Sequence, residues 1–469
     1  MADKPTSPPP AYFLSLSLEN VRSFGAKQTI SFATKEGGPA QWTIILGDNG
    51  VGKTTVLKSL AVLRPMKYME RDSQLFHPDN KYNPIKFEDF FHTAFSHFNQ
   101  NREFLIRAGG EESSTVHCQM SIGQSLKEFL VKNEGGSTVE ARISIKGEYD
   151  SEATILRFKQ SGLICYGYGA GRTIGNSTLS ETPETQDTCI SLFNDRADLL
   201  NPEEWFLFAD YRMAKDKDPL TTQNFHLIKA ALLKIMEEGE VTDLDVAPVQ
   251  SGNGGSPRQG VRFKTPYGWV RLRDMSLGYQ TLVVWLTDLA DKLFVRYPNS
   301  KNPLAEPAIV LIDEIDLHLH PSWQRKLLKS LSEIFVNTQF IATAHSPLVV
   351  QAAGDVRANV VLLRREGDQT VVVTDVEDVR GWRLDQILTS ELFGLETARS
   401  PATERKLARR AELLTKTKRT AAEKKELADL TKELDAEPVG ETPSEREVNG
   451  VLQELRQRLL NKDASSATA

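Results

Sequence analysis

A glycine-rich loop between two apolar segments constrains the fold of this chain more than any other feature. Ile44, Ile45 and Leu46 lead into the loop, and apolar residues resume after it at Val56. In such a loop, glycines let backbone N–H groups curl around phosphates, a lysine supplies a cation, and a hydroxyl at the start of the next helix can hold Mg²⁺. The pattern predicts a site for a nucleoside triphosphate. The residues expected to contact it are Gly47, Asn49, Gly50, Gly52, Lys53, Thr54 and Thr55.

Two further apolar runs end in residues that suit phosphate chemistry. The run Ala308–Ile312 is followed by Asp313 and Glu314, and the run Gln339–Ala344 is followed by His345. Continuous apolar runs suit the strands of a parallel sheet, which are buried on both faces. Asp313 could then reach Mg²⁺ through water, Glu314 could accept a proton from an attacking water, and His345 could touch the γ-phosphate. The alternatives are acids that face solvent and a histidine that is merely packed or exposed.

The order of these features resembles the ABC-type ATPases of the SMC and RecF kind. In that family a Walker A loop, a signature loop, a Walker B strand, a D-loop and a switch histidine follow one another. The signature corresponds to Met275–Gln280, which precedes an apolar helix predicted over Thr281–Val295. It departs from the usual pattern at Leu277 and Tyr279. The alternative is that Ser276 is an ordinary helix cap.

The D-loop corresponds to Ile315–Pro321, in which His318 and His320 have the spacing of metal ligands. No cysteine or further histidine lies near them in the sequence, so a zinc site is not expected. Pro321 instead suits the first position of the next helix.

The resemblance implies an α/β fold, with an ABC-type P-loop ATPase head built from a mixed sheet flanked by helices. It also implies ATP and Mg²⁺ as cofactors, with Thr54 and Asp313 at the metal and Glu314 and His345 as catalytic residues. Ser276 and Gly278 would contact nucleotide held by a second copy of the chain, so the site would be shared by two protomers.

More than two hundred residues separate Lys53 from Asp313, whereas one βαβ excursion separates the corresponding motifs of AAA+ proteins. The intervening residues therefore predict an α+β insertion that forms a separate layer. We expect polar helices over Phe87–Phe104, a β-hairpin region over Thr115–Phe158, a turn over Tyr166–Arg172 and helices over Pro202–Glu238. No long heptad run occurs, so the coiled-coil arms of SMC proteins are not expected.

A narrower resemblance rests on Tyr166–Arg172, Leu14–Phe24 and Gly381–Ser390. These segments look like the PtuA-like ATPase subunits of Septu and retron anti-phage systems. The likeness covers about residues 12–415. It implies a homodimer or larger oligomer that controls a separately encoded nuclease or toxin, of the HNH or Toprim type. Arg172 would lie near the phosphates or the dimer interface, unless it is simply solvated beyond a glycine turn.

Two other functions share the same ATPase motifs. One is a RecF-like repair clamp that grips duplex DNA with basic residues. The other is a self-contained nuclease with a Toprim domain after the ATPase. The second is disfavoured, because the chain beyond Asp378 is charged and helical in pattern and has no apolar strand to carry the nuclease acids.

The composition predicts a cytoplasmic protein with no membrane segment. Its 469 residues are 40% hydrophobic, but no apolar run approaches 18 residues without a charge. The three cysteines form no disulfide or metal pattern, and the net charge of −6 gives no overall attraction to nucleic acid. The expected organisation is a disordered tail (1–11), a first part of the head (12–65), an insertion (66–260), a second part of the head (261–400) and a charged helical extension (401–469).

The helical extension has an uneven charge distribution. Residues 405–425 contain nine Lys or Arg against Glu412 and Glu423, and acidic residues dominate the next segment up to Glu441. Leucines at helical spacing predict two antiparallel helices, and a last amphipathic helix is expected over Ser444–Leu460. The charges fit three roles: self-paired solvated helices, a surface that docks a partner protein, or a nucleic-acid contact.

Overall fold

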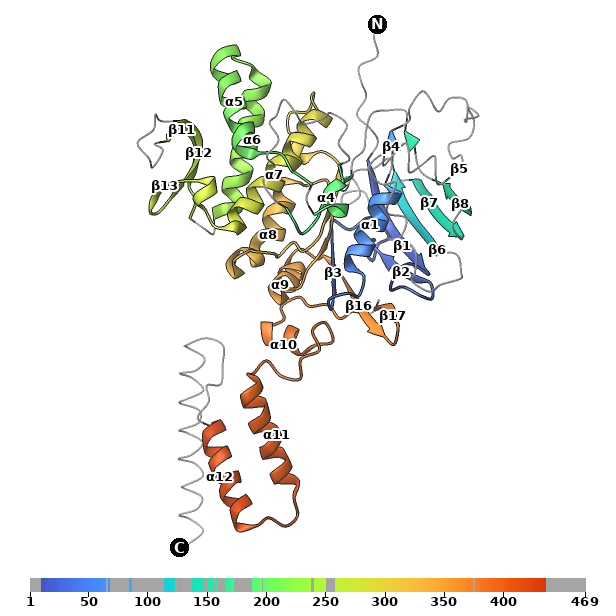
Figure 1. The fold of residues 1–469 in the computed structure, drawn as a ribbon, viewed down its shortest axis with the longest axis vertical. Coiled ribbons are helices and arrows are strands. Elements are labelled where there is room, and N and C mark those ends of the chain that lie inside the picture. The colour runs from blue at the N-terminus through green and yellow to red at the C-terminus, as the bar shows by residue number, and fades with distance from the viewer. Residues whose placement is uncertain are drawn as a thin grey trace. The chain divides into compact units, whose positions relative to one another are not determined.

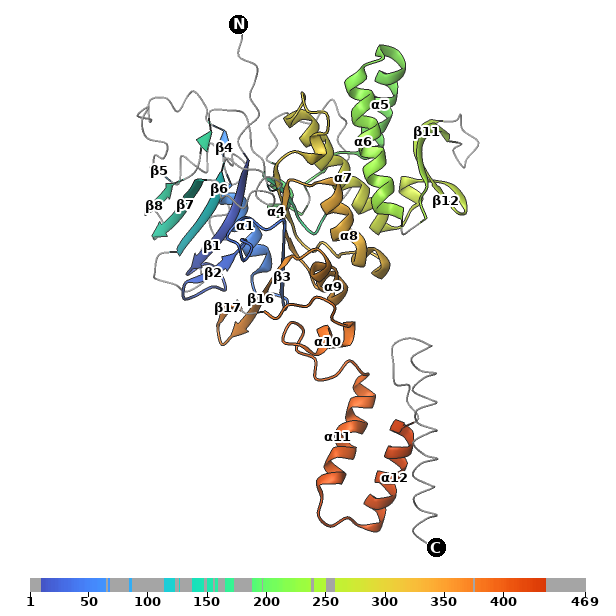
Figure 2. The same ribbon diagram turned by 180° about the vertical axis from the view of Figure 1, so that it is seen from behind.

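Two six-stranded sheets enclose the helix that follows the glycine-rich loop (Figures 1 and 2). This helix, α1 (Lys53–Leu63), contacts strands of both sheets, and eight of its eleven residues are buried. A helix that is apolar on nearly every side belongs in the interior of a domain. The architecture therefore holds the loop before α1 at the centre of the head.

The computed structural model describes residues 10–64, 66–67, 84–86, 114–122, 126, 137–146, 150–154, 157–158, 165–172, 188–195, 197–237, 240–249, 258–373 and 376–435. They belong to two units, residues 1–394 and residues 395–469. The helices expected over Phe87–Phe104 and Ser444–Leu460 lie outside the described residues. No helix in the described ranges is long and apolar enough to cross a membrane.

The first sheet is antiparallel throughout, with the strand order β2-β1-β6-β7-β8-β5. Its strands β6–β8 confirm the β-hairpins expected over Thr115–Phe158, but they pair with β1 and so extend the first sheet of the head. The tail expected to reach residue 11 ends earlier, because Ala11 already belongs to β1. The strands are β1 (Ala11–Glu19), β2 (Gln28–Ser31), β5 (Pro84–Lys86), β6 (Ser114–Ile122), β7 (Ser137–Lys146) and β8 (Asp150–Thr154).

The second sheet is mixed, as expected for an ABC-type head, and has the order β10-β14-β15-β3-β16-β17. The first five strands are parallel, and β17 is antiparallel to β16. Strands β14 and β15 are buried along their whole length, which explains their continuous apolar sequence. The strands are β3 (Trp42–Gly47), β10 (Cys165–Tyr168), β14 (Ala308–Ile312), β15 (Thr338–Thr343), β16 (Asn359–Glu366) and β17 (Gln369–Val373).

Strand β10 corrects the sequence interpretation, which had assigned Tyr166–Arg172 to a turn within the insertion. Residues Cys165–Tyr168 form a buried strand of the mixed sheet, beside β14. Gly167 lets this strand pack closely against Leu192, because a Cβ there would lie 2.5 Å from Cδ1 of Leu192. Only Gly169–Arg172 form the turn that follows.

Helices and two small sheets complete the head. The helical stretches expected after Pro202 and after the signature are confirmed as α5, α6 and α7. A sheet of β11 (Asp243–Val249), β12 (Arg258–Thr265) and β13 (Gly268–Arg271) packs near α5 and α6, and β4 (Met66–Lys67) pairs with β9 (Arg157–Phe158). The helices are α4 (Ile190–Phe193), α5 (Pro202–Asp216), α6 (Pro219–Met236), α7 (Leu277–Arg296), α8 (Pro321–Ile334), α9 (Pro347–Asp355) and α10 (Leu384–Thr389), with short 3₁₀ turns at Leu272–Asp274 and Pro303–Ala305.

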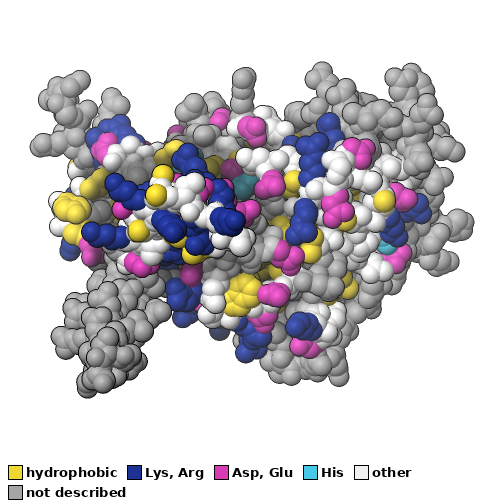
Figure 3. Space-filling model, turned by 90° about the horizontal axis from the view of Figure 1, so that it is seen from below, with side chains coloured by type: hydrophobic (Ala, Val, Ile, Leu, Met, Phe, Trp, Pro, Cys, Tyr) yellow, Lys and Arg dark blue, Asp and Glu magenta, His cyan; other side chains and the backbone are white. Residues whose placement is uncertain are grey.

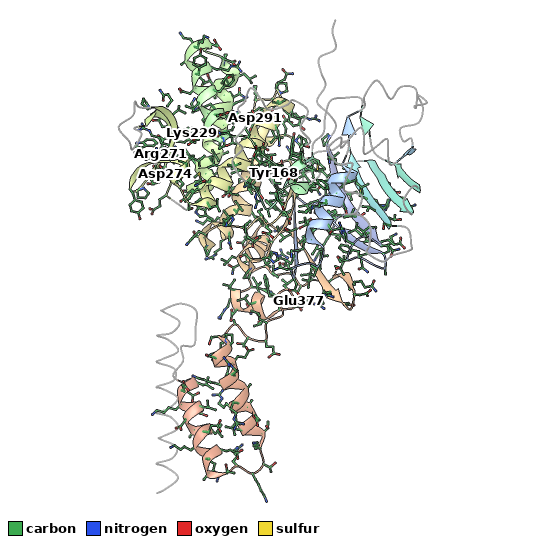
Figure 4. The ribbon with its side chains drawn as sticks, in the orientation of Figure 1. Tyr168, Lys229, Arg271, Asp274, Asp291 and Glu377 are labelled. Atoms are coloured by element: carbon green, nitrogen blue, oxygen red, sulfur yellow. The ribbon has the colours of Figure 1, made fainter. Side chains whose placement is uncertain are left out.

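Buried polar side chains fix the relative positions of these layers. The amide of Gln339 on β15 donates to the carbonyl of Phe13 on β1 and accepts from its N–H, both at 2.8 Å. In the middle of the head, where Figure 4 shows Tyr168 and Asp291, the Tyr168 hydroxyl donates to Asp288 of α7 at 2.8 Å. Trp205 of α5 donates to Asp291 at 2.8 Å, and burial raises the pKa of this carboxyl. Each buried group has a partner, so these contacts lock β10, α5 and α7 together.

The second unit contains the expected antiparallel pair, α11 (Pro401–Thr415) and α12 (Ala421–Asp435). Basic residues of α11, together with Lys416 directly after it, pair with acidic residues of α12. These ion pairs are Lys406 with Glu433, Arg409 with Glu426, Arg410 with Asp435, and Lys416 with Glu423. Much of the charge is thus paired within the hairpin.

Candidate nucleotide site

Four parallel strands end at one edge of the mixed sheet, and the segments after them form the candidate site. Strands β10, β14, β15 and β3 are in register, so Gly169–Arg172, Asp313–Glu314, Ala344–His345 and the glycine-rich loop meet at their carboxyl ends. Ligands of open α/β sheets bind at this edge. The fold therefore brings together four segments that lie apart in the sequence.

The glycine-rich loop has the conformation of a phosphate cradle. Gly47, Gly50 and Gly52 have positive φ values of 142°, 81° and 93°, which favour glycine. A Cβ on Gly47 would also lie 2.4 Å from the carbonyl oxygen of Leu363. Helix α1 begins directly after Gly52 without a side-chain cap, so its first N–H groups face the loop. An uncapped helix start of this kind suits a phosphate.

Lys53 and an adjacent cavity extend the cradle. The Lys53 ammonium donates to the carbonyls of Gly47 and Asp48 at 2.7 and 2.8 Å, and burial lowers its pKa. Beside it lies a cavity of about 420 Å³, which is large enough for part of a nucleotide. The cavity is lined by Arg22, Ser23, Gly50, Gly52, Thr54, Thr55 and Lys58.

Thr54 and Asp313 form a cluster of oxygen atoms that suits Mg²⁺. The Thr54 hydroxyl donates to one carboxylate oxygen of Asp313 at 2.7 Å, and the Thr343 hydroxyl donates to the other at 2.6 Å. Adjacent ligands of an octahedral Mg²⁺ at about 2.1 Å lie about 3 Å apart, so the Thr54 and Asp313 oxygens have suitable spacing. The oxygen chemistry and the burial of Asp313 therefore fit this ion.

Glu314 follows Asp313 in an unusual backbone conformation. Its φ of 49° lies in the left-handed region, and its N–H donates to the Thr343 hydroxyl at 2.7 Å. The guanidinium of Arg172 donates to the Glu314 carbonyl at 2.7 Å. Arg172 is 4% exposed, so it is not the solvated arginine of the simpler interpretation.

His345 lies exposed at the end of β15, and its backbone N–H donates to Asp316 at 2.9 Å. This contact joins the residue to the D-loop. His320 of the D-loop caps α8 by accepting from the Ser322 N–H, and Pro321 occupies the first turn, as the sequence predicted.

The signature residues begin α7. Ser276 is the N-cap and is exposed, but its side chain makes no capping hydrogen bond. Gly278 packs on the D-loop, since a Cβ there would lie 2.4 Å from the carbonyl oxygen of His318. In both ribbon views α7 begins beside β13, on the side of the head away from α1 (Figures 1 and 2). Ser276 and Gly278 are thus not gathered with the glycine-rich loop of the same chain.

Two family models and several known proteins match parts of this chain. A family model described as "AAA domain, putative AbiEii toxin, Type IV TA system" matches residues 192–351, and one described as "AAA domain" matches residues 15–158. The chain is 26% identical over 367 residues to the Septu protein PtuA of Bacillus mycoides (strain KBAB4), covering 78% of this chain and 42% of that protein. It is 52% identical over 75 residues to the Retron Ec83 probable ATPase of Escherichia coli, covering 16% of this chain and 14% of that protein.

The chain therefore resembles AAA-domain proteins and PtuA. Among solved structures, the SmcHead bound to the C-winged helix domain of ScpA aligns with a TM-score of 0.40 and 17% identity, covering 77% of this chain and 97% of that one. The mixed sheet flanked by helices confirms the α/β fold class expected from the sequence, and the matches to PtuA and to a retron ATPase agree with the expected resemblance. The chain spans less than half the length of the two curated relatives described above.

Sequence reasoning missed several residues that line or support the candidate site. Arg22 and Ser23 contribute to the cavity from the segment after β1, and Lys58 contributes from α1. The resemblance of Leu14–Phe24 to the family was the sequence signal that could have pointed to Arg22 and Ser23. Thr343 had no such signal, because a threonine inside an apolar strand is ordinary.

Proposed function

We propose that this chain binds and hydrolyses ATP at the carboxyl edge of its mixed sheet, and that the resulting change controls a separately encoded nuclease in anti-phage defence. The contact between Thr54 and Asp313 carries the proposal, because it brings the phosphate loop and the Walker B strand to one point. The proposal extends to a cytoplasmic location, because the three cysteines form no disulfide or metal pattern in the sequence.

Each residue has a distinct role in the proposed reaction. Glycine N–H groups and Lys53 hold the β- and γ-phosphates, with Asn49 and Thr55 beside them. When bound, Mg²⁺ neutralises the charge that develops on the phosphates, and Thr54 and Asp313 would hold it. Glu314 accepts a proton from the attacking water, and His345 contacts the γ-phosphate.

The proposed site is completed by a second copy of the chain. The exposure of Ser276 and the start of α7 on the β13 side of the head support this arrangement. The N-terminus of α7 in one protomer would contact nucleotide held by its partner, with Ser276 and the backbone at Gly278 at the contact. ATP binding would then bring two protomers together, and hydrolysis would release them.

The effector must receive this change through a surface outside the nucleotide site. The turn between α11 and α12 offers one, because Lys416, Lys418, Arg419, Lys424 and Lys425 surround it with Glu423 as the single acid from 416 to 425. Figure 3 shows Lys and Arg side chains gathered where this hairpin faces the viewer. We propose that an acidic surface of an HNH or Toprim nuclease docks on this basic turn.

A RecF-like clamp on DNA is the second candidate, and the same basic turn favours it, since phosphates also bind such a cluster. ATP hydrolysis by the purified chain, with Lys53→Ala as the control, tests the shared ATPase. Co-expression with the product of an adjacent nuclease gene, and binding to duplex DNA at two salt concentrations, separates the two candidates. A complex with the nuclease and no binding to DNA supports the defence function, and the reverse result supports the clamp.

A further inference from the structure

We propose that Arg172 is a positioning residue, which holds the backbone of Glu314 in the conformation that aims its carboxylate at the attacking water. The inference rests on the proposed ATPase function and assigns Arg172 a task other than phosphate binding. The contact itself is direct, since a guanidinium nitrogen of Arg172 lies 2.7 Å from the Glu314 carbonyl oxygen.

Glu314 needs such support because its backbone is strained. A φ of 49° is unfavourable for a residue with a side chain. Two contacts oppose relaxation: the Glu314 N–H donates to Thr343, and the Glu314 carbonyl accepts from Arg172. The peptide groups on both sides of the Glu314 Cα are therefore held in place. Together they set the direction of its Cα–Cβ bond, from which the carboxylate extends.

Burial of the charged Arg172 side chain costs free energy that a purely structural role would not require. Arg172 is buried, and its Nε has no hydrogen-bond partner among the described residues. Burial lowers the pKa of its guanidinium to about 10, while Asp313, Glu314 and Asp316 oppose that change, so the group stays charged at neutral pH. A buried cation with an unpaired donor is rarely retained for packing alone.

The turn before Arg172 is held rigidly. Tyr168 is bonded to Asp288 of α7, and its carbonyl accepts from the Asp313 N–H at 2.8 Å. A Cβ on Gly169 would lie 2.1 Å from the Ser191 carbonyl oxygen, and one on Gly171 would lie 2.7 Å from that of Asp195. Both glycines allow the turn to lie directly on the segment around α4. The rigid turn therefore holds Arg172 in position against Glu314.

The test compares Arg172→Met, which keeps volume but loses the donors, with Arg172→Lys, which keeps the charge. Arg64→Met is the matched control, because Arg64 is also buried and donates to a backbone carbonyl, that of Ala61. Binding sites are counted with a fluorescent ATP analogue, and kcat is expressed per binding site. A structural role would reduce the number of sites but leave kcat per site unchanged.

We expect Arg172→Met to lower kcat per site about 100-fold and Arg172→Lys about 10-fold, with the affinity for the ATP analogue within about threefold of the wild type. Arg64→Met should leave kcat per site unchanged. In a Glu314→Gln background the Arg172 changes should have no further effect, since they act through the same carboxylate.

Wild-type kcat per site in both Arg172 variants would overturn the inference. So would a loss of ATP binding that matches the loss of hydrolysis, since Arg172 would then contact the nucleotide. Failure of both variants to fold would make it a structural residue and would also overturn the inference. Absence of hydrolysis in the wild-type chain would instead contradict the proposed function.

Discussion

The Thr54 hydroxyl donates a 2.7 Å hydrogen bond to the Asp313 carboxylate, although 259 positions separate the two residues in sequence. The contact spans the start of α1 and the end of β14, two elements that meet because β3, β15 and β14 are adjacent in the mixed sheet. The hydroxyl and the carboxylate oxygen have the spacing of two adjacent ligands among the six of an octahedral Mg²⁺.

Thr343 supports this pair, and its removal should impair the site. Thr343→Val loses the bonds to Asp313 and to the Glu314 N–H, leaving two buried groups unpaired at a cost of about 1–3 kcal/mol. We expect a lower melting temperature and hydrolysis reduced at least tenfold. The matched control is Thr338→Val on the same strand, because the Thr338 hydroxyl is buried without a partner in the described ranges. Equal melting temperatures and rates in the two variants would contradict the role given to Thr343.

The shared-site proposal predicts that Ser276→Arg leaves ATP binding intact but abolishes ATP-dependent dimerisation. Ser276 is exposed at the start of α7, so a long side chain should disturb a partner more than its own fold. Sedimentation of a Glu314→Gln chain, with and without Ser276→Arg, measures the effect. Dimers that form equally well in both would place the second protomer elsewhere.

A substitution of Gly278 tests the dimer interface less clearly than a substitution of Ser276 does. A side chain there collides with the chain's own D-loop carbonyl at His318, so Gly278→Leu should also lower the melting temperature. Ser276 is the better probe of the interface for this reason.

The α11–α12 hairpin should loosen in acid. The ammonium of Lys416 and the Thr420 N–H hold the pKa of Glu423 at about 2, below its ordinary value of 4.5. A lowered folded-state pKa contributes stability above pH 4.5, which is lost as the pH falls from 4.5 towards 2. Hydrogen exchange of α12, corrected for intrinsic rates, should show protection falling ~2- to 5-fold over this range, as for an exposed ion pair. Glu423→Gln should begin with the lower protection, and a wild-type hairpin that keeps its full protection at pH 2 would refute the assignment.

The basic turn of the hairpin should matter for the partner but not for catalysis. Changing Lys418, Lys424 and Lys425 to Glu should reduce co-purification of the effector nuclease about tenfold or more, because it reverses the charge at the turn. ATP hydrolysis should stay at the wild-type rate. Deletion of residues 401–469 should have the same effect, whereas a retained complex and retained phage protection would move the docking site to the region between Thr55 and Met275.

The sequence predicted the parts of the site that lie in local motifs. Gly47–Thr55, Asp313 and Glu314 could be proposed as site residues because each follows an apolar run whose pattern defines a strand. Arg172 could be noted but its partner could not, because its contact with Glu314 depends on β10 lying beside β14 across 142 positions of sequence.

The extent of the head was harder to predict for a similar reason. Strands β6–β8 pair with β1, and β10 joins the mixed sheet, so residues assigned to an insertion complete both sheets. Hydrophobic periodicity indicates which residues form a strand, but it does not indicate which distant strand pairs with it. The antiparallel pair of α11 and α12 was predicted, with self-pairing as one role of its charges, but composition does not say which charges pair.

The most direct test of the account is single-turnover ATP hydrolysis by Glu314→Gln beside the wild type and Lys53→Ala. A positioned general base contributes roughly 10²- to 10⁴-fold, so Glu314→Gln should bind ATP with wild-type affinity and hydrolyse it at least 100-fold more slowly. Lys53→Ala should instead lose binding, since its ammonium belongs to the phosphate cradle. Hydrolysis by Glu314→Gln at the wild-type rate would contradict the account.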